Sequence, residues 1–177
     1  EKQIENFIER LIKDKDEKKV VLGFPSFFDE IISYLEKHNK SYNNLNLTSF
    51  VAKSEYLNEF TKTKLSRLLN TQVLSRYSCE EIGILAQQTI KSPNKFVVNN
   101  ASYQIEILNF ENDQPVTPGE YGRIVITDLF NYAMPLIRYD TGDIGKLASN
   151  DNGLIRLDAI EGRKSDILYN TAGEIVP

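Results

Sequence analysis

Hydrophobic and polar positions follow two alternating periods in the first half of the chain. Apolar side chains recur at helical spacing over residues 3–13, 25–39 and 57–69, with charged residues between them. Short apolar runs at residues 20–24, 47–52 and 72–77 have the length and composition of buried strands. Strands that alternate with helices of this length predict parallel β-α units, which bind ligands beyond the carboxyl ends of their strands.

The pattern changes near residue 92 to short strands with period-two alternation. These strands are predicted at residues 95–98, 103–108, 122–128, 144–148 and 153–157, with turn dipeptides such as Pro118-Gly119 between them. Such spacing favours an antiparallel meander or a small barrel. The predicted fold class is therefore α/β. A parallel β-α-β sandwich portion covers residues 1–92, a small antiparallel distorted β-barrel covers residues 93–160, and a closing segment covers residues 161–177.

The amino-acid composition excludes several classes of function. The net charge of −4 gives no basic surface for a nucleic-acid backbone or an anionic membrane. A single cysteine, Cys79, excludes an internal disulfide framework, and a single histidine, His38, excludes most zinc-hydrolase and Ser-His-Asp schemes. No apolar run spans a membrane and no signal peptide opens the chain, so we expect a cytoplasmic protein. The missing initiator Met suggests a piece excised from a longer protein.

Two polar segments that follow expected strands carry candidate binding groups. After the strand ending at Tyr77, an aromatic ring, a small residue and the carboxylate of Glu81 could stack on a base and hold a divalent metal. The alternative is a polar loop whose Glu pair starts a helix. In the second segment, Asp143 follows a tight Thr-Gly turn and could accept hydrogen bonds from vicinal hydroxyls. The alternative is an ordinary β-turn.

The third polar segment covers residues 161–166. Its guanidinium, Arg163, could anchor a ribose or a phosphate, because a guanidinium offers two parallel donors. The alternative is an ion pair within the loop, between Arg163 and either Asp166 or Glu161. Each of the three segments is ambiguous when taken alone. Their order and spacing are more informative.

The four ordered motifs of this chain resemble those of the adenylate-forming superfamily of acyl-CoA synthetases, adenylation domains and luciferase. They are Tyr-small-x-x-Glu from residue 77, Gly-Glu-Tyr-Gly-Arg-Ile-Val-Ile-Thr over residues 119–127, Arg-Tyr-Asp-Thr-Gly-Asp over 138–143 and Gly-Arg-x-x-Asp over 162–166. Residues 135–139 and 173–177 look most like phenylacetate–CoA ligases, and similar capsular polysaccharide biosynthesis proteins fit as well. The resemblance is strong from residue 54 onward.

The resemblance implies a site for ATP assembled from these motifs. The implied nucleotide-binding residues are Tyr77 against the adenine, Ser78 in place of the usual Gly, Asp143 on both ribose hydroxyls, and Arg163 on the ribose. Glu81 matches the carboxylate that helps to hold Mg²⁺. Ser165 falls at the hinge about which a small C-terminal domain rotates between half-reactions, so residues 161–177 would be a hinge segment. We expect the side chains of Tyr77, Asp143 and Arg163 to converge on one crevice.

In the implied reaction a small-molecule carboxylic acid reacts with ATP to give an acyl-adenylate and pyrophosphate. A thiol, typically that of coenzyme A, then displaces AMP. Three departures from the family pattern stand out: Glu80 replaces Ser or Thr, residues 52–55 replace a Gly-rich turn, and residues 87–89 offer no Cys or His, so no zinc is expected. The 177 residues contain neither the family's phosphate loop nor its lysine-bearing domain, so the isolated chain is expected to be inactive. Two alternatives remain: a non-catalytic nucleotide-binding or scaffold homologue, and a small domain that binds no nucleotide.

Overall fold

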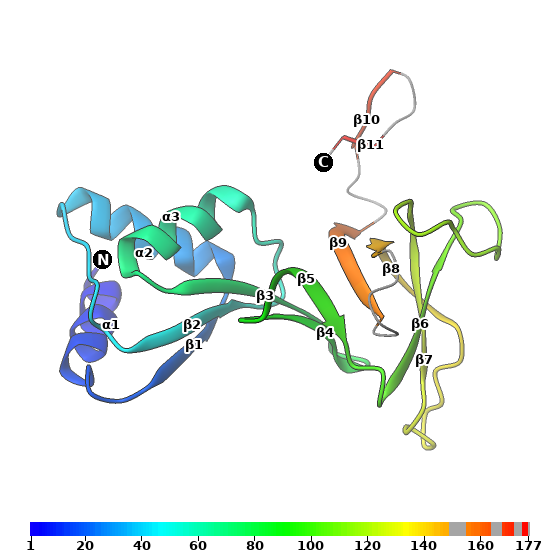
Figure 1. The fold of residues 1–177 in the computed structure, drawn as a ribbon, viewed down its shortest axis with the longest axis horizontal. Helices are drawn as coiled ribbons and strands as arrows, with labels where there is room; N and C mark the ends of the chain where they lie inside the picture. The colour runs from blue at the N-terminus through cyan, green and yellow to red at the C-terminus, as the bar shows by residue number, and fades with distance from the viewer. Residues whose placement is uncertain (149–154, 164–167, 172–174, 177) are drawn as a thin grey trace. The chain divides into compact units, whose positions relative to one another are not determined.

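The computed structural model describes residues 1–148, 155–163, 168–171 and 175–176 (Figure 1). The chain divides into two compact units, Glu1–Arg76 and Tyr77–Pro177. This division falls before the change of pattern near residue 92, because the hairpin that covers residues 83–98 is antiparallel and belongs to the second unit. Strand β3 (Gln72–Cys79) begins in the first unit and ends in the second.

The first unit alternates strands and helices as the hydrophobic periods predict (Figure 1). Its strands β1 (Lys19–Gly23) and β2 (Leu47–Ala52) and the first part of β3 pair in parallel. Its helices are α1 (Lys2–Lys13), α2 (Pro25–Lys37) and α3 (Glu59–Leu69). No helix in the described part of the chain is long and apolar enough to cross a membrane.

Local chemistry explains where the helices of this unit begin. Helix α2 starts at Pro25, whose missing N–H needs no partner in the first turn. Helix α3 starts two residues later than its apolar pattern suggests, because the side chain of Asn58 accepts the backbone N–H of Thr61 at 2.8 Å and caps the helix. The α3 end is set by Asn70, whose backbone is left-handed.

One hydrophobic core joins the three helices to their sheet. Fully buried side chains of this core come from α2, α3 and β2 and include Phe28, Ile31, Leu35, Leu65 and Phe50. The rings of Phe28 and Phe50 meet edge to face with their centroids 5.2 Å apart. Edge-to-face contact is a favoured arrangement of aromatic rings, so this pair ties α2 to the sheet.

The second unit is an antiparallel sheet in the strand order β4, β5, β9, β8, β7, β6. The strands are β4 (Gly83–Thr89), β5 (Ser92–Val98), β6 (Tyr103–Leu108), β7 (Tyr121–Asp128), β8 (Tyr139–Leu147) and β9 (Arg156–Arg163). A short pair, β10 (Leu168–Tyr169) and β11 (Ile175–Val176), follows. The antiparallel second half is thus confirmed. Among the described residues β4 and β6 do not pair with each other, so this part of the sheet is open and not a closed barrel.

Strand β8 carries a large bulge where a turn was expected. Asp140 pairs with Val125 and Ile144 pairs with Arg123, so the three residues from Thr141 to Asp143 stand opposite Ile124 alone. Gly142 has a φ of +77°, which a side chain would disfavour. A bulge bends its strand and re-aims the side chains within it. The Thr-Gly pair therefore redirects Asp143 inside a continuous strand and does not end that strand.

Candidate functional site

Three side chains that the sequence singled out come together in the second unit. Tyr77 lies near the end of β3, Asp143 lies in the bulge of β8, and Arg163 is the last residue of β9. The Tyr77 hydroxyl donates to Oδ2 of Asp143 at 2.7 Å. Asp143 and Arg163 are direct register partners, and Arg163 Nε lies 4.0 Å from Asp143 Oδ1. Asp143 is thus the centre of the group.

The Thr141 side chain connects Tyr77, Asp143 and strand β7, a role that sequence reasoning missed. Its Oγ1 lies 3.2 Å from the Tyr77 hydroxyl, accepts the backbone N–H of Asp143 at 3.2 Å and donates to the carbonyl of Ile124 at 3.0 Å. The Thr141 side chain is buried. A buried hydroxyl with three partners fixes the bulge firmly, because each lost partner would leave a polar group unsatisfied.

Burial and charge set the protonation of Tyr77. Its burial, and next the negative charge of Asp143, raise the pKa of the Tyr77 hydroxyl. The hydroxyl therefore stays protonated at neutral pH and remains a donor to Asp143. Tyr77 is only 8% exposed and packs in the hydrophobic core of the second unit, so a small part of it is available beside a base.

The two charged side chains of this group differ in exposure. The Asp143 side chain is 15% exposed, whereas that of Arg163 is 69% exposed. An ion pair with one partner largely in water contributes little to stability. The ion pair that the structure shows for Arg163 is the one with Asp143, whereas Glu161 accepts the Tyr121 hydroxyl at 3.0 Å. Asp166 and the expected hinge residue Ser165 lie outside the described residues.

Asp143 also lines a pocket of about 160 Å³, together with Arg123, Asp140, Gly142 and Ile144. Sites for small molecules usually measure about 300–1,000 Å³. The pocket is therefore large enough for one part of a ligand, such as a sugar, and not for a whole nucleotide. Its polar wall is made by the bulge and by the neighbouring residue of β7.

The Tyr77 motif continues into a hairpin turn. Residues 80–82 form the turn and β4 follows it, so the alternative that the Glu pair starts a helix is wrong. Ser78 is half-buried, and Glu81 is exposed. Burial of Cys79, and next the charge of Glu81, raise the pKa of the Cys79 thiol to about 11, so this thiol is protonated at neutral pH and is a poor nucleophile.

A magnesium ion at Glu81 would need ligands beyond this carboxylate. Within the described ranges, no three or more His, Cys, Asp or Glu side chains gather to hold a metal ion. Mg²⁺ is commonly bound by one or two carboxylates together with substrate phosphates and water. A single exposed carboxylate at a hairpin turn fits that mode of binding.

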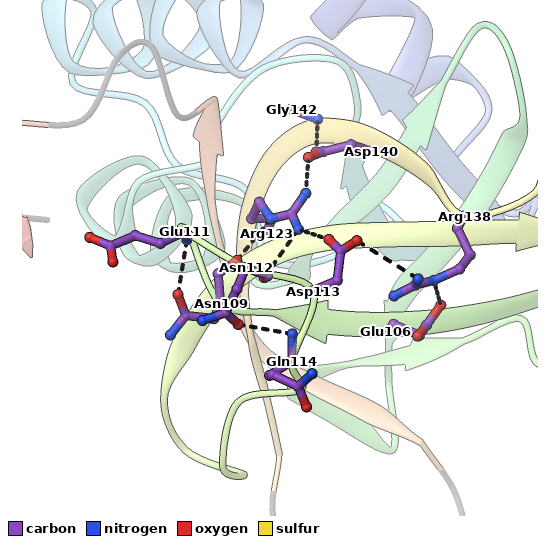
Figure 2. Close-up of polar contacts among 10 residues, drawn as sticks. All are labelled: Glu106, Asn109, Glu111, Asn112, Asp113, Gln114, Arg123, Arg138, Asp140 and Gly142. Carbon is purple, nitrogen blue, oxygen red and sulfur yellow. Dashed lines mark hydrogen bonds and ion pairs between the residues drawn. The ribbon is translucent and has the colours of Figure 1, made fainter.

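A network of charged side chains centred on Arg123 lies beside the bulge (Figure 2). Arg123 Nη1 lies 2.6 Å from Asp140 Oδ2, and Arg123 Nη2 lies 2.5 Å from Asp113 Oδ1. Arg123 Nε donates to the carbonyl of Asn109 at 2.9 Å. The hydrogen bonds to Asp140 and Asp113 raise the pKa of Arg123. Sequence reasoning included Arg123 in a motif and assigned it no role.

Comparisons with known proteins find ligases among the proteins that this chain is similar to. No protein-family model matches the chain. The chain is 25% identical over 173 residues to a phenylacetate-coenzyme A ligase of Escherichia coli (strain K12), a match that covers 95% of this chain and 39% of the ligase. For the phenylacetate-coenzyme A ligase of Pseudomonas putida, the identity is 23% over 181 residues, covering 100% of this chain and 40% of the ligase.

Solved structures show the same fold. A 2-hydroxyisobutyryl-CoA ligase in the postadenylation state, in complex with 2-HIB-AMP, matches with a TM-score of 0.83 and 20% identity over 98% of this chain and 38% of that chain. The apo MatB from Rhodopseudomonas palustris matches with a TM-score of 0.66 and 18% identity over 95% of this chain and 35% of that chain. The chain spans about two fifths of the length of the curated relatives. The chain is therefore similar in sequence to phenylacetate-coenzyme A ligases and shares its fold with structures of acyl-CoA ligases.

Proposed function

We propose that this chain supplies the ribose-binding part of the nucleotide site in an ATP-dependent ligase that activates a carboxylic acid. The observation that carries the proposal is the Asp143 carboxylate, which lines the pocket while Tyr77 holds one of its oxygens at 2.7 Å. A carboxylate fixed in this way keeps lone pairs for the two hydroxyls of a ribose. One structural relative is solved with 2-HIB-AMP and another with ATP, which supports a nucleotide ligand.

The other residues of the group have matching roles in this proposal. Arg163 extends from the register position beside Asp143 into solvent, where its guanidinium reaches the ribose of a bound nucleotide. The exposed part of Tyr77, with Ser78 next to it, lies beside the adenine. Ser165 is the hinge residue in this proposal, and that assignment rests on its place in the Gly-Arg-x-x-Asp motif alone.

The reaction would proceed in two steps. A carboxylate oxygen of the substrate attacks the α-phosphorus of ATP, the bond to the β-phosphate oxygen breaks, and pyrophosphate leaves. The thiol of coenzyme A then attacks the acyl carbon and releases AMP. Mg²⁺ on the phosphates would neutralise charge in the first step, with Glu81 as its ligand from this chain. The contribution of Asp143 is to position the nucleotide for that attack.

The carboxylic acid substrate would belong to one of a few chemical classes. The curated relatives are phenylacetate-coenzyme A ligases, so an aryl acetate is the first candidate. Another aromatic acid or a sugar-linked precursor, as in capsular polysaccharide biosynthesis, is the second. Release of pyrophosphate by the full-length parent with each acid would rank these candidates. Absence of turnover with all of them would contradict the ligase assignment.

We expect the chain to bind AMP more tightly than 2′,3′-dideoxy-AMP. The dideoxy analogue lacks both hydroxyls that Asp143 would accept, and a hydrogen bond to a charged group contributes about 1.5–3 kcal/mol. The expected difference in the dissociation constants is therefore at least about tenfold. Isothermal titration calorimetry with both nucleotides measures it. Equal affinities, or no binding of AMP at millimolar concentration, would sink the proposed site.

The Glu81 assignment predicts that ATP binding depends on Mg²⁺. Glu81→Gln should raise the Mg²⁺ concentration needed for half-maximal ATP binding about tenfold, within the range seen when a supporting group at a metal site is removed. Glu80→Gln, one residue away in the same exposed turn, is the matched control. If the wild-type protein binds ATP equally well without Mg²⁺, a non-catalytic nucleotide-binding homologue becomes the better assignment, which the carboxylate pair at Glu80 and Glu81 also favours.

A further inference from the structure

We propose that Arg123 is a positioning residue of this nucleotide site, acting through Asp140 and the bulge to hold the Asp143 carboxylate in its binding orientation. The inference rests on the proposed function of Asp143. It adds a residue that lines the same pocket and bonds to Asp140 and not to Asp143 directly. The bulge is attached to β7 through two consecutive residues at its start, Asp140 and Thr141.

The first attachment is the side chain of Asp140, at the start of the bulge. Arg123 Nη1 donates to Oδ2 of Asp140 at 2.6 Å. The other oxygen, Oδ1, accepts the backbone N–H of Gly142 at 3.0 Å (Figure 2). An Asp side chain that bonds to the backbone two residues later forms an Asx-turn. Arg123 therefore fixes the carboxylate that in turn fixes the peptide next to Asp143.

The second attachment is Thr141, which donates to the carbonyl of Ile124 and accepts the N–H of Asp143. Arg123 and Ile124 are consecutive residues of β7. The whole excursion from Asp140 to Asp143 is thus tied to one dipeptide. Gly142 at φ +77° gives the excursion its sharp bend, and such backbone persists only when its surroundings hold it.

Arg123 is itself held from the opposite side by the β6–β7 connection. Its Nε donates to the carbonyl of Asn109, and its Nη2 reaches the carbonyl of Asn112 at 3.3 Å and the carboxylate of Asp113 at 2.5 Å. Arg138 adds a second link to Asp113 at 3.9 Å. The Arg123 side chain is 18% exposed. A guanidinium with this many fixed acceptors is a rigid support, unlike a typical surface ion pair.

Charge gives Arg123 a second effect on the pocket. Asp140 and Asp143 both line it, and two carboxylates in one small pocket repel each other. The guanidinium of Arg123 neutralises Asp140 directly. Asp143 is then the carboxylate left to accept donors from a ligand. Without Arg123, Asp140 would be an uncompensated negative charge beside the proposed ribose.

A cycle of variants and nucleotides tests this role. Arg123→Gln should weaken AMP binding about tenfold while changing the affinity for 2′,3′-dideoxy-AMP by less than about twofold, since the analogue cannot use Asp143. Arg123→Lys should lose less, because one ammonium replaces only part of the forked contact. Asp140→Ala, which removes the Asx-turn, should reproduce the pattern of Arg123→Gln. Lys146→Gln, on the same strand β8, is the control and should bind both nucleotides like the wild type.

The outcomes separate this inference from the proposed function. If the wild type prefers AMP and the Arg123 and Asp140 variants keep that preference, the positioning role is wrong and the ribose site stands. An equal loss of affinity for both nucleotides shows a general structural role and also overturns the inference. If the wild type shows no preference, the proposed function fails first. Thermal unfolding of each variant, recorded beside the titrations, identifies any that do not fold, and Asp140→Ala then decides.

Discussion

Asp143→Ala is expected to weaken AMP binding about ten- to hundredfold, the largest effect of any single change at the site. The substitution removes a carboxylate that would accept both ribose hydroxyls, and a hydrogen bond to a charged group contributes about 1.5–3 kcal/mol. Each 1.4 kcal/mol corresponds to roughly a factor of ten in affinity. The Asp143 side chain is mostly buried, so solvent weakens this interaction less than it would at an open surface.

Matched variants separate binding from folding in this experiment. Asp143→Ala also leaves the buried Tyr77 hydroxyl without its 2.7 Å acceptor, which costs about 1–3 kcal/mol of stability. Adding Tyr77→Phe should restore part of that stability and none of the AMP affinity. Asp158→Ala removes an acid of β9 that pairs with Lys95, and it should leave binding unchanged. An Asp143→Ala protein that is folded and binds AMP normally would refute the assignment.

Phe28→Ala should lower the free energy of unfolding by about 3–5 kcal/mol, the cost typical for truncating a buried aromatic side chain. Phe28 is 0% exposed and meets Phe50 edge to face, so the smaller side chain leaves a cavity between α2 and the sheet. Urea denaturation followed by circular dichroism measures the change.

Phe60→Ala is the control for that measurement, because Phe60 is an aromatic residue of the same unit that is 66% exposed. Its truncation should change stability by less than about 0.5 kcal/mol, as for most surface substitutions. A loss of under about 1 kcal/mol for Phe28→Ala would mean that α2 does not depend on this contact, contrary to the packing described for the first unit.

Elements with strong local signals could be predicted from the sequence. The expected strands at residues 47–52 and 103–108 coincide with β2 and β6, since both segments are rich in strand-forming residues and polar turn residues flank them. The β-α alternation of the first unit followed from the same periods. Local signals also identified Tyr77, Asp143 and Arg163, and the structure places these three together.

Features that depend on contacts distant in sequence could not be predicted. Asp-Thr-Gly has the chemistry of a turn, and only pairing with β7 turns it into a bulge within one strand. Strand β4 follows a Glu pair that equally suits a helix start, and its hairpin partner decides the outcome. The partners of Arg123 lie 10 and 17 residues away along the chain, so no local pattern pointed to its role.

The bulge in β8 also limits how this strand can change in length. Three residues opposite one give a surplus of two, an even number, so Tyr139 before the bulge and Leu147 after it both pack against the core of the second unit. Because strand side chains alternate between faces, gaining or losing a single residue here would turn Leu147 outward. We therefore expect the second unit to lose more stability from a one-residue insertion at this position than from a two-residue insertion.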